Sequence, residues 1–324
     1  MENIFQIPEQ NHLYMYNRNH QRLAPSQLND TLKPLPFYFF GSGSSGNSVY
    51  LTRLHTLIDL GFPYNHYTNL NPNFFLDVDF LILTHEHNDH FKFPTFYKIL
   101  TNAPNVKIII SKRMFEVITE TDQNKNKIAK QVSGNFTEKI NAIKTTYKNR
   151  FIIIESSQQQ AIPLTTRHNL EFWFTPHMVS HGPIQNMAIE ISTYQYDIHL
   201  LYSSDIDHLL DDTGSDVAHN MGLPINYTTT ENLQSPNFFP YSHALTINPL
   251  KNPFNLLFLE ANYDEHVLEP ILERDPYNVR ALSNKRHISE QEAWRYVNYS
   301  LSPDGIFIPL HASSTFGTLI QDLN

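Results

Sequence analysis

Hydrophobic residues recur along this chain in short runs, separated by turns that contain glycine, proline or asparagine. From Phe37 onward the runs are rich in branched and aromatic residues, which is typical of β-strands. The run at 79–84 (DFLILT) is almost continuously apolar, as in a strand that is buried on both faces of a sheet. We predict strands at 37–40, 48–52, 55–60, 79–84, 106–110, 150–154, 170–175, 187–192, 197–203, 255–260 and 305–310.

Segments with the spacing of hydrophobic residues that is typical of helices lie between several of these strands. This spacing predicts a helix near 93–101 and helical structure through 112–148. A further helix is expected from Ser289, because Ser289 and Glu292 have the S-x-x-E spacing of a capping box. Strands that recur in two blocks and alternate with helices predict a layered α/β fold.

Two segments lack this periodicity. Residues 1–35 are rich in Asn, Gln and Pro, and we interpret them as an N-terminal extension or a surface arm. Residues 207–252 also lack a regular pattern, which predicts a long insertion or lid. That insertion would interrupt a single domain that spans 36–324.

The amino-acid composition limits the classes of protein to which this chain can belong. A chain of 324 residues, 40% of them hydrophobic, can bury a substantial core. No apolar stretch approaches the ~18 residues of a membrane span, so no membrane association is expected. The first residues, MENIFQIPEQ, lack the basic and apolar regions of a signal peptide, so we expect a cytoplasmic protein. A homo-oligomer is compatible with the sequence, which does not decide the oligomeric state.

Charge and cysteine content restrict the chemistry. With no cysteine, any metal must bind through imidazole and carboxylate groups. A net charge of −9 argues against a protein that coats nucleic acid, although two divalent ions would add about +4 locally. Basic residues concentrate in 112–150, which we interpret as a solvated surface in preference to a phosphate-binding face.

The most informative motif is THEHNDH at 84–90, directly after the strand at 79–84. Where the chain turns sharply after a strand, His85 and His87 can converge on one ion, while Asp89 and His90 approach a second. Imidazole suits zinc, manganese or iron, and a carboxylate compensates charge. A histidine-rich surface loop is the alternative interpretation.

Four ligands do not complete two metal sites. Further ligands are expected at strand ends, where the rim of a sheet brings distant segments together. His181, Asp205 and His311 each follow a predicted strand closely. His177 is an alternative to His181.

The motifs FGSGSSGNSVYLT, LIDLG, THEHNDH, SHGPIQNMAIEI, YSSD, LEANYD and PLHASS resemble successive motifs of metallo-β-lactamase-fold hydrolases. The resemblance covers about 37–324, apart from the insertion. It is closest to the bacterial WalJ-type (YycJ-like) exonuclease branch, whose members are similar to RNase Z and RNase J nucleases. It implies a four-layer αββα sandwich of two mixed β-sheets.

The resemblance also implies roles for individual residues. His85, His87 and His181 would hold one metal ion, and Asp89, His90 and His311 the other. Asp205 would bridge the two ions, which would be Zn²⁺ or Mn²⁺. Asp59 would orient the ligand loop. NKRHIS at 284–289 is similar to the branch's G-H-L-S-N motif, which would place His287 and Ser289 near the substrate phosphate.

Three positions depart from the branch. Gly182 stands where an Asp is usual, Glu290 replaces an Asn, and the last motif reads HASST. These changes leave the metal ligands complete and concern the surroundings of the substrate.

The expected function is hydrolysis of a phosphodiester in a nucleic acid or nucleotide by a hydroxide held between two metal ions. Asp89, Asp205 and His287 would be the catalytic residues, with Asp89 moving a proton to the leaving group. One alternative is an ester, lactone or β-lactam-type hydrolase on the same fold. The other is a non-catalytic metal-binding interaction module.

Overall fold

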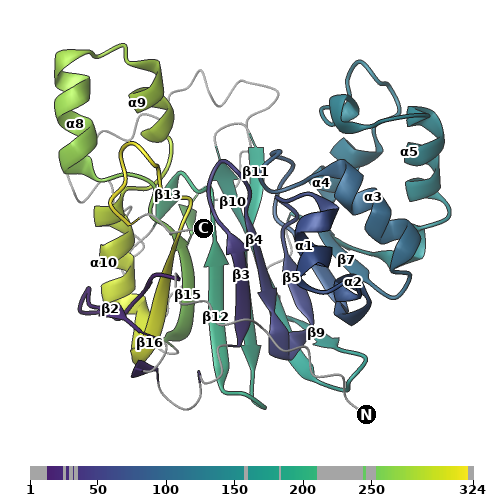
Figure 1. Cartoon of the computed structure of the whole chain (residues 1–324), viewed down its shortest axis with the longest axis horizontal. Coiled ribbons are helices and arrows are strands. Elements are labelled where there is room, and N and C mark those ends of the chain that lie inside the picture. The colour runs from purple at the N-terminus through teal and green to yellow at the C-terminus, as the bar shows by residue number, and fades with distance from the viewer. Residues whose placement is uncertain are drawn as a thin grey trace.

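A computed structural model of the chain describes residues 13–24, 27–28, 32, 36–156, 160–181, 184–209, 244–245 and 253–319. Its described strands form two large mixed sheets and a short parallel pair, β13 (His208–Leu209) with β14 (Ala244–Leu245). Helices flank both large sheets (Figure 1).

The first sheet has six strands in the order β3-β4-β5-β6-β7-β8. The pairs from β3 to β5 are antiparallel and the pairs from β5 to β8 are parallel. The strands are β3 (Phe37–Gly41), β4 (Ser48–Leu51), β5 (Thr56–Ile58), β6 (Phe80–Leu83), β7 (Lys107–Ser111) and β8 (Phe151–Ile154).

The second sheet has eight strands in the order β2-β1-β16-β15-β12-β11-β10-β9. Strands β12, β15 and β16 run parallel, so their carboxyl ends share one edge. The strands are β1 (Met15–Tyr16), β2 (Arg22–Leu23), β9 (Ile162–Thr165), β10 (Glu171–His181), β11 (Ile184–Thr193), β12 (Ile198–Ser203), β15 (Phe254–Glu260) and β16 (Leu301–Leu310).

Strand β6 shows how the sequence pattern produces the layers. Phe80 and Ile82 belong to the core between the two sheets, whereas Leu81 and Leu83 belong to the core under the helices of the first sheet. Because side chains of a strand alternate between faces, a continuous apolar run fills both cores. This confirms the predicted strand that is buried on both faces.

Three apolar cores separate four layers. One lies between the sheets. A second joins the first sheet to α1 (Tyr64–Leu70), α2 (Phe74–Asp77), α3 (Phe93–Asn102), α4 (Lys112–Thr119) and α5 (Phe136–Lys144). A third joins the second sheet to α10 (Glu290–Ser300). The predicted four-layer αββα sandwich of two mixed sheets is therefore confirmed.

Two helical predictions have different outcomes. Helix α10 begins after Ser289 with both hydrogen bonds of the capping box, as predicted. The segment 112–148, predicted to be helical, is divided into α4 and α5 by a non-helical stretch with one short 3₁₀ turn. Within that stretch the Asn126 side chain donates to the backbone carbonyl of Glu120, a local bond that replaces helical ones.

Part of the predicted N-terminal arm contributes to the sandwich. Strand β1 pairs with β16, Tyr16 opposite Phe307, and Leu13 and Met15 are buried in the core between the sheets. The predicted insertion at 207–252 lies outside the described residues, except for 207–209 and 244–245. No helix in the described part of the chain is long and apolar enough to cross a membrane.

Candidate metal centre

The side chains predicted to bind metal come from the carboxyl ends of strands in both sheets. The loop 84–90 follows β6, His181 ends β10, Asp205 follows β12 and His311 follows β16. Backbone hydrogen bonds hold the loop against the end of β5: Leu60 N–H donates to the His90 carbonyl at 2.7 Å. The two sheets therefore bring these segments together at one edge of the sandwich.

Gly61 permits this close approach. A Cβ atom at position 61 would lie 2.0 Å from the carbonyl oxygen of Asp89 and 2.2 Å from the backbone nitrogen of Asn47. Asn47 N–H itself donates to that Asp89 carbonyl at 2.7 Å. The glycine of the LIDLG motif thus lets three segments meet behind the metal loop.

The predicted ligands form two groups that share one residue. The first comprises His85, His87, His181 and Asp205, and the second comprises Asp89, His90, Asp205 and His311. Within each group, one ligand atom of every residue lies within 4.8 Å of those of the others. Asp205 belongs to both groups, as a bridging carboxylate would.

Several of these ligand atoms lack a hydrogen-bond partner among the described residues. They are buried, and they are Nε2 of His85, Nε2 of His90, Nδ1 of His181 and both carboxylate oxygens of Asp205. Asp205 Oδ2 lies 2.7 Å from His90 Nε2, but the geometry is not that of a hydrogen bond. Buried polar atoms are nearly always satisfied, so the donor set suits cations between these groups.

Three residues around the centre have left-handed backbone conformations. The φ angles are 59° at Asp59, 55° at Asp205 and 53° at His311. Such angles cost roughly 1–3 kcal/mol each in residues other than glycine and concentrate at functional sites. Here the conformations of Asp205 and His311 accompany side chains that belong to the ligand groups, and that of Asp59 accompanies a carboxylate that contacts the His90 ring.

Asp59 supports the ligand loop from behind. Its carboxylate is fully buried and lies 2.7 Å from Nδ1 of His90, on the ring side opposite Asp205. Thr84 donates to it from both backbone and side chain, and the Tyr202 hydroxyl donates at 3.2 Å. Asp59 therefore fixes both the orientation and the tautomer of the His90 ring.

Burial and neighbouring charge set the protonation of the ligands. Burial, with a smaller contribution from His85, lowers the pKa of His87 to about 4, and burial lowers the pKa of His181 well below its usual range. Both imidazoles are neutral near pH 7 and have a lone pair for a metal ion.

The two carboxylates of the centre stay ionised. Burial favours the neutral acid, but His311 and His90 hold the pKa of Asp205 well below its ordinary value. The pKa of Asp89 is also lowered, because a hydrogen bond from His311 and the charge of His90 outweigh burial. Two negative groups thus face the space between the imidazoles.

No family model matches this sequence, and none of the curated proteins matches it. Solved structures of similar architecture exist. Human tRNase Z, short form, is 13% identical, with a TM-score of 0.46 over 86% of this chain and 92% of that one. The metallo-β-lactamase fold protein YhfI from Bacillus subtilis is 13% identical, with a TM-score of 0.41 over 87% and 96%. A diphosphatase from the PhnP family is 13% identical, with a TM-score of 0.39 over 87% of each chain. These similarities are too weak to assign an activity.

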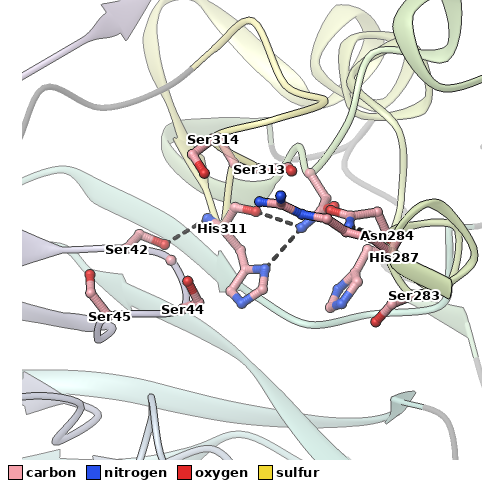
Figure 2. A pocket seen from close by; sticks show the side chains of 13 residues that line it. Ser42, Ser44, Ser45, Ser283, Asn284, His287, His311, Ser313 and Ser314 are labelled. Carbon is pink, nitrogen blue, oxygen red and sulfur yellow. Dashed lines mark hydrogen bonds between the residues drawn. The ribbon is translucent and has the colours of Figure 1, made fainter.

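A cavity of about 400 Å³ adjoins the centre, and His287 and His311 line it together (Figure 2). Nδ1 of His287 donates to the buried Glu260 carboxylate at 2.5 Å. Burial opposes protonation of His287, but Glu260 outweighs it and raises the pKa to about 9. His287 thus presents a cationic ring beside the ligand His311.

The remaining wall of the cavity is polar. In Figure 2 the loop with Ser42, Ser44 and Ser45 faces Ser283 and Asn284 across the cavity. Arg280, Asn262 and the stretch 311–314 complete the lining. Hydroxyl, amide and guanidinium groups of this kind donate hydrogen bonds to anionic oxygens.

Two sequence-predicted residues belong to neither ligand group. His177 contacts Glu190 at 2.9 Å and belongs to neither ligand group, whereas His181 does. Ser289 is fully buried in the cap of α10, where it donates to Glu265 at 2.6 Å and accepts from Glu292. Its predicted contact with the substrate has no support in this geometry.

Sequence reasoning did not single out Glu260 or Asn262. Glu260 pairs with His287, and the Asn262 amide donates to the backbone carbonyl of His311 at 2.7 Å. Both belong to LEANYD, a motif that the resemblance included without assigning roles to its residues. A carboxylate at the end of a buried apolar strand was the available signal.

Proposed function

We propose that this chain is a metal-dependent hydrolase that cleaves phosphodiester bonds in a nucleic acid or nucleotide. Two divalent cations, Zn²⁺ or Mn²⁺, would be held by His85, His87 and His181 on one side and by Asp89, His90 and His311 on the other, with Asp205 between them. The observation that carries the proposal is the pair of ligand groups that share Asp205, whose buried carboxylate faces imidazoles without a hydrogen bond among the described residues.

When bound, the two cations would lower the pKa of a water molecule and withdraw charge from the phosphate oxygens. The protein's own groups provide the rest. Asp89, hydrogen-bonded to His311, would accept a proton and pass it toward the leaving oxygen. His287, held by Glu260, would neutralise a nonbridging phosphate oxygen.

The polar cavity favours a phosphate-containing substrate. Arg280 and the serines that line it would donate to phosphate oxygens, next to the His287 ring. An ester or β-lactam substrate has fewer anionic oxygens to occupy so many donors. The cavity therefore supports the phosphodiester over the ester, lactone or β-lactam alternative.

Within this class we propose an exonuclease of the WalJ type, acting in the cytoplasm. Two segments that resemble distinctive motifs of that branch contact residues of the centre, which supports this proposal. Ser42 accepts the backbone N–H of His311, and the Asn47 amide contacts the Asp89 carboxylate. Glu260 and Asn262, from the other motif, contact His287 and His311.

The test uses a matched pair of variants on β10. Purified protein is assayed with Zn²⁺ or Mn²⁺ on linear DNA, RNA and cyclic nucleotides, with an ester, a lactone and a β-lactam in parallel. His181→Ala should lower metal-dependent cleavage at least 100-fold, because it removes a ligand. His177→Ala changes the same residue type four residues earlier on the same strand and should retain cleavage.

Three outcomes would contradict the proposal. Cleavage of the ester, lactone or β-lactam without any phosphodiester cleavage would identify the alternative hydrolase. Tight metal binding with no hydrolysis of any substrate would identify an interaction module. Equal activity of His181→Ala and wild type would remove His181 from the site.

A further inference from the structure

A second histidine–carboxylate cluster lies at the end of β5 opposite the candidate metal centre. His55 directly precedes β5 and Asp59 directly follows it, so the two lie on the order of 13 Å apart along the strand. His55, Asp77 and His168 each offer one ligand atom, and these atoms lie within 4.8 Å of one another. None of the three belongs to the centre described above.

We propose that His55, Asp77 and His168 bind a third divalent transition-metal ion of the Zn²⁺ class. The three residues come from distant parts of the chain: the turn before β5, the end of α2 and the turn between β9 and β10. The ion would therefore link the helix side of the first sheet to an edge hairpin of the second sheet.

The first two ligands are held in place by neighbouring groups. The Tyr50 hydroxyl donates to Oδ2 of Asp77 at 2.6 Å, and Oδ1 of Asp77 lies 3.3 Å from Nδ1 of His55. The same Nδ1 lies 3.1 Å from the backbone carbonyl of Asp77. Both side chains are partly exposed, 18% for His55 and 30% for Asp77, so an ion can reach them from solvent.

The backbone of His55 is also constrained. Its φ angle is 48°, in the left-handed region, and its carbonyl accepts hydrogen bonds from the N–H groups of Asp79 and Phe80. A left-handed conformation outside glycine persists only where the surroundings enforce it. Here it directs the imidazole toward the end of α2.

The third ligand, His168, lies in the turn of the hairpin formed by β9 and β10, which is hydrogen-bonded to the segment after α2. Arg167, the residue before His168, donates to the Asp79 carboxylate from its side chain and, at 2.8 Å, from its backbone. Its guanidinium also donates to the carbonyls of Leu76 and Val78 at the end of α2. These bonds place the exposed His168 over His55, with ring centroids 4.4 Å apart.

The ligand set determines the class of ion. Two imidazoles and one carboxylate suit Zn²⁺, Co²⁺ or Ni²⁺, with solvent in the remaining positions, and disfavour Mg²⁺ and Ca²⁺. The ring separation of 4.4 Å for His55 and His168 is shorter than the 4.8 Å of His85 with His87, a pair that we assign to one ion.

A simple ion pair between His55 and Asp77 would not require His168. This difference makes His168→Ala the diagnostic variant, because His168 is exposed and its loss leaves the contacts of Asp77 with Tyr50 and His55 intact. His266→Ala is the matched control: His266 is also exposed, on α8 (Glu265–Arg274), and belongs to no ligand group among the described residues.

The experiment counts bound metal on the full chain without a histidine tag. Chelator-treated protein is titrated with Co²⁺, followed by visible absorption and by elemental analysis after gel filtration. Wild type and His266→Ala should bind one ion more than His168→Ala. Asp77→Asn should lose the same ion. Hydrolytic activity of His168→Ala should stay within about twofold of wild type, because the residue lies at the other end of β5.

The proposal is overturned if His168→Ala and wild type bind the same number of ions with the same affinity. The test of this third site can be distinguished from the test of the proposed function. If the catalytic centre binds no metal, wild type should still bind one ion and His168→Ala none. If the centre binds two and both proteins bind two, the third site does not exist.

Discussion

Asp59 shows how a single residue can act on the metal centre without belonging to it. Its carboxylate is buried, receives hydrogen bonds from Thr84 and Tyr202, and contacts the His90 ring on the side away from Asp205. The backbone of Asp59 has a φ angle of 59°, a strained left-handed conformation that places the carboxylate beside His90. The orientation of His90 therefore depends on a side chain that does not reach the metal position.

We predict that Asp59→Asn weakens metal binding roughly 10–100-fold while the protein stays folded, because an amide holds the His90 tautomer less strongly. The measurement is Zn²⁺ affinity in competition with a chromophoric chelator. Asp197→Asn is the control, since Asp197 has a similar left-handed backbone, with φ of 49°, on an exposed turn. Equal affinities for the two variants would show that Asp59 has no role in orienting His90.

At the residue scale, the sequence predicted candidate ligands from the 84–90 motif, from strand ends and from the family resemblance, but it did not predict their contacts. Geometry groups His181 and not His177 with the other ligands, although both are histidines on β10. The alternation of side chains along a strand could not tell His177 from His181, because residues four apart point to the same face of the sheet. Only the distance along β10 to the loop 84–90 distinguishes them.

At the scale of strands, β10, β11 and β12 are joined by a cross-strand ladder of polar groups. Glu190 on β11 accepts from His177 on β10 at 2.9 Å and from His199 on β12 at 2.8 Å. Burial would raise the pKa of Glu190, but the hydrogen bonds from the two histidines lower it to about 2. Glu190 is therefore ionised in the folded protein, where it links β11 to β10 and β12.

This pairing predicts a pH dependence of stability. A carboxyl group whose pKa is lowered on folding stabilises the protein above its unfolded pKa of about 4.3, and the contribution is lost as pH falls toward 2. Glu190→Gln should therefore lower the free energy of unfolding by on the order of 1–3 kcal/mol at pH 6 and by much less at pH 2.5. Urea unfolding of chelator-treated protein at both pH values measures this. A difference that does not change with pH would contradict the ladder.

Helix α10 shows a motif with a local role. Ser289 was expected near the substrate from the similarity of NKRHIS to a known motif, and the S-x-x-E spacing also predicted a capping box. The hydroxyl is buried in the cap, with Glu265 and Glu292 as partners. The capping prediction is confirmed because it depends on residues three apart, whereas substrate contact depends on the direction in which the whole helix end faces.

At the scale of the molecule, the centre joins the two sheets. The loop 84–90 belongs to the first sheet, whereas His181, Asp205 and His311 belong to the second (Figure 1). Without cations, carboxylates and imidazoles that lack hydrogen bonds remain buried between the sheets. Metal binding should therefore stabilise the whole domain as well as supply chemistry.

We predict that removing metal with a chelator lowers the midpoint of thermal unfolding by about 6 °C for each ion lost, because an ion present at ~1,000 times its Kd stabilises by about 4 kcal/mol. Differential scanning fluorimetry before and after re-addition of Zn²⁺ or Mn²⁺ measures the shift. The same comparison in His168→Ala excludes a contribution from the proposed third ion. Identical midpoints with and without chelator would show that no cation joins the sheets.

The sequence by itself determined the layers of this protein and indicated a candidate metal motif. The continuous apolar run of β6 predicted cores on both faces of the first sheet, and THEHNDH after a buried strand predicted metal ligands at that strand's end. Both are local patterns, since burial and turn geometry act on residues close together in the chain.

Only the tertiary structure decided which distant residues meet. Asp205 belongs to both ligand groups, Glu260 holds His287, and His168 lies over His55 because separate strand ends and turns converge in space. No spacing in the sequence encodes these pairs, which are set by the order and register of strands in two sheets. The residue types therefore indicated which chemistry to propose for this chain, whereas the arrangement of the candidate ligands is set by the packing of the two sheets.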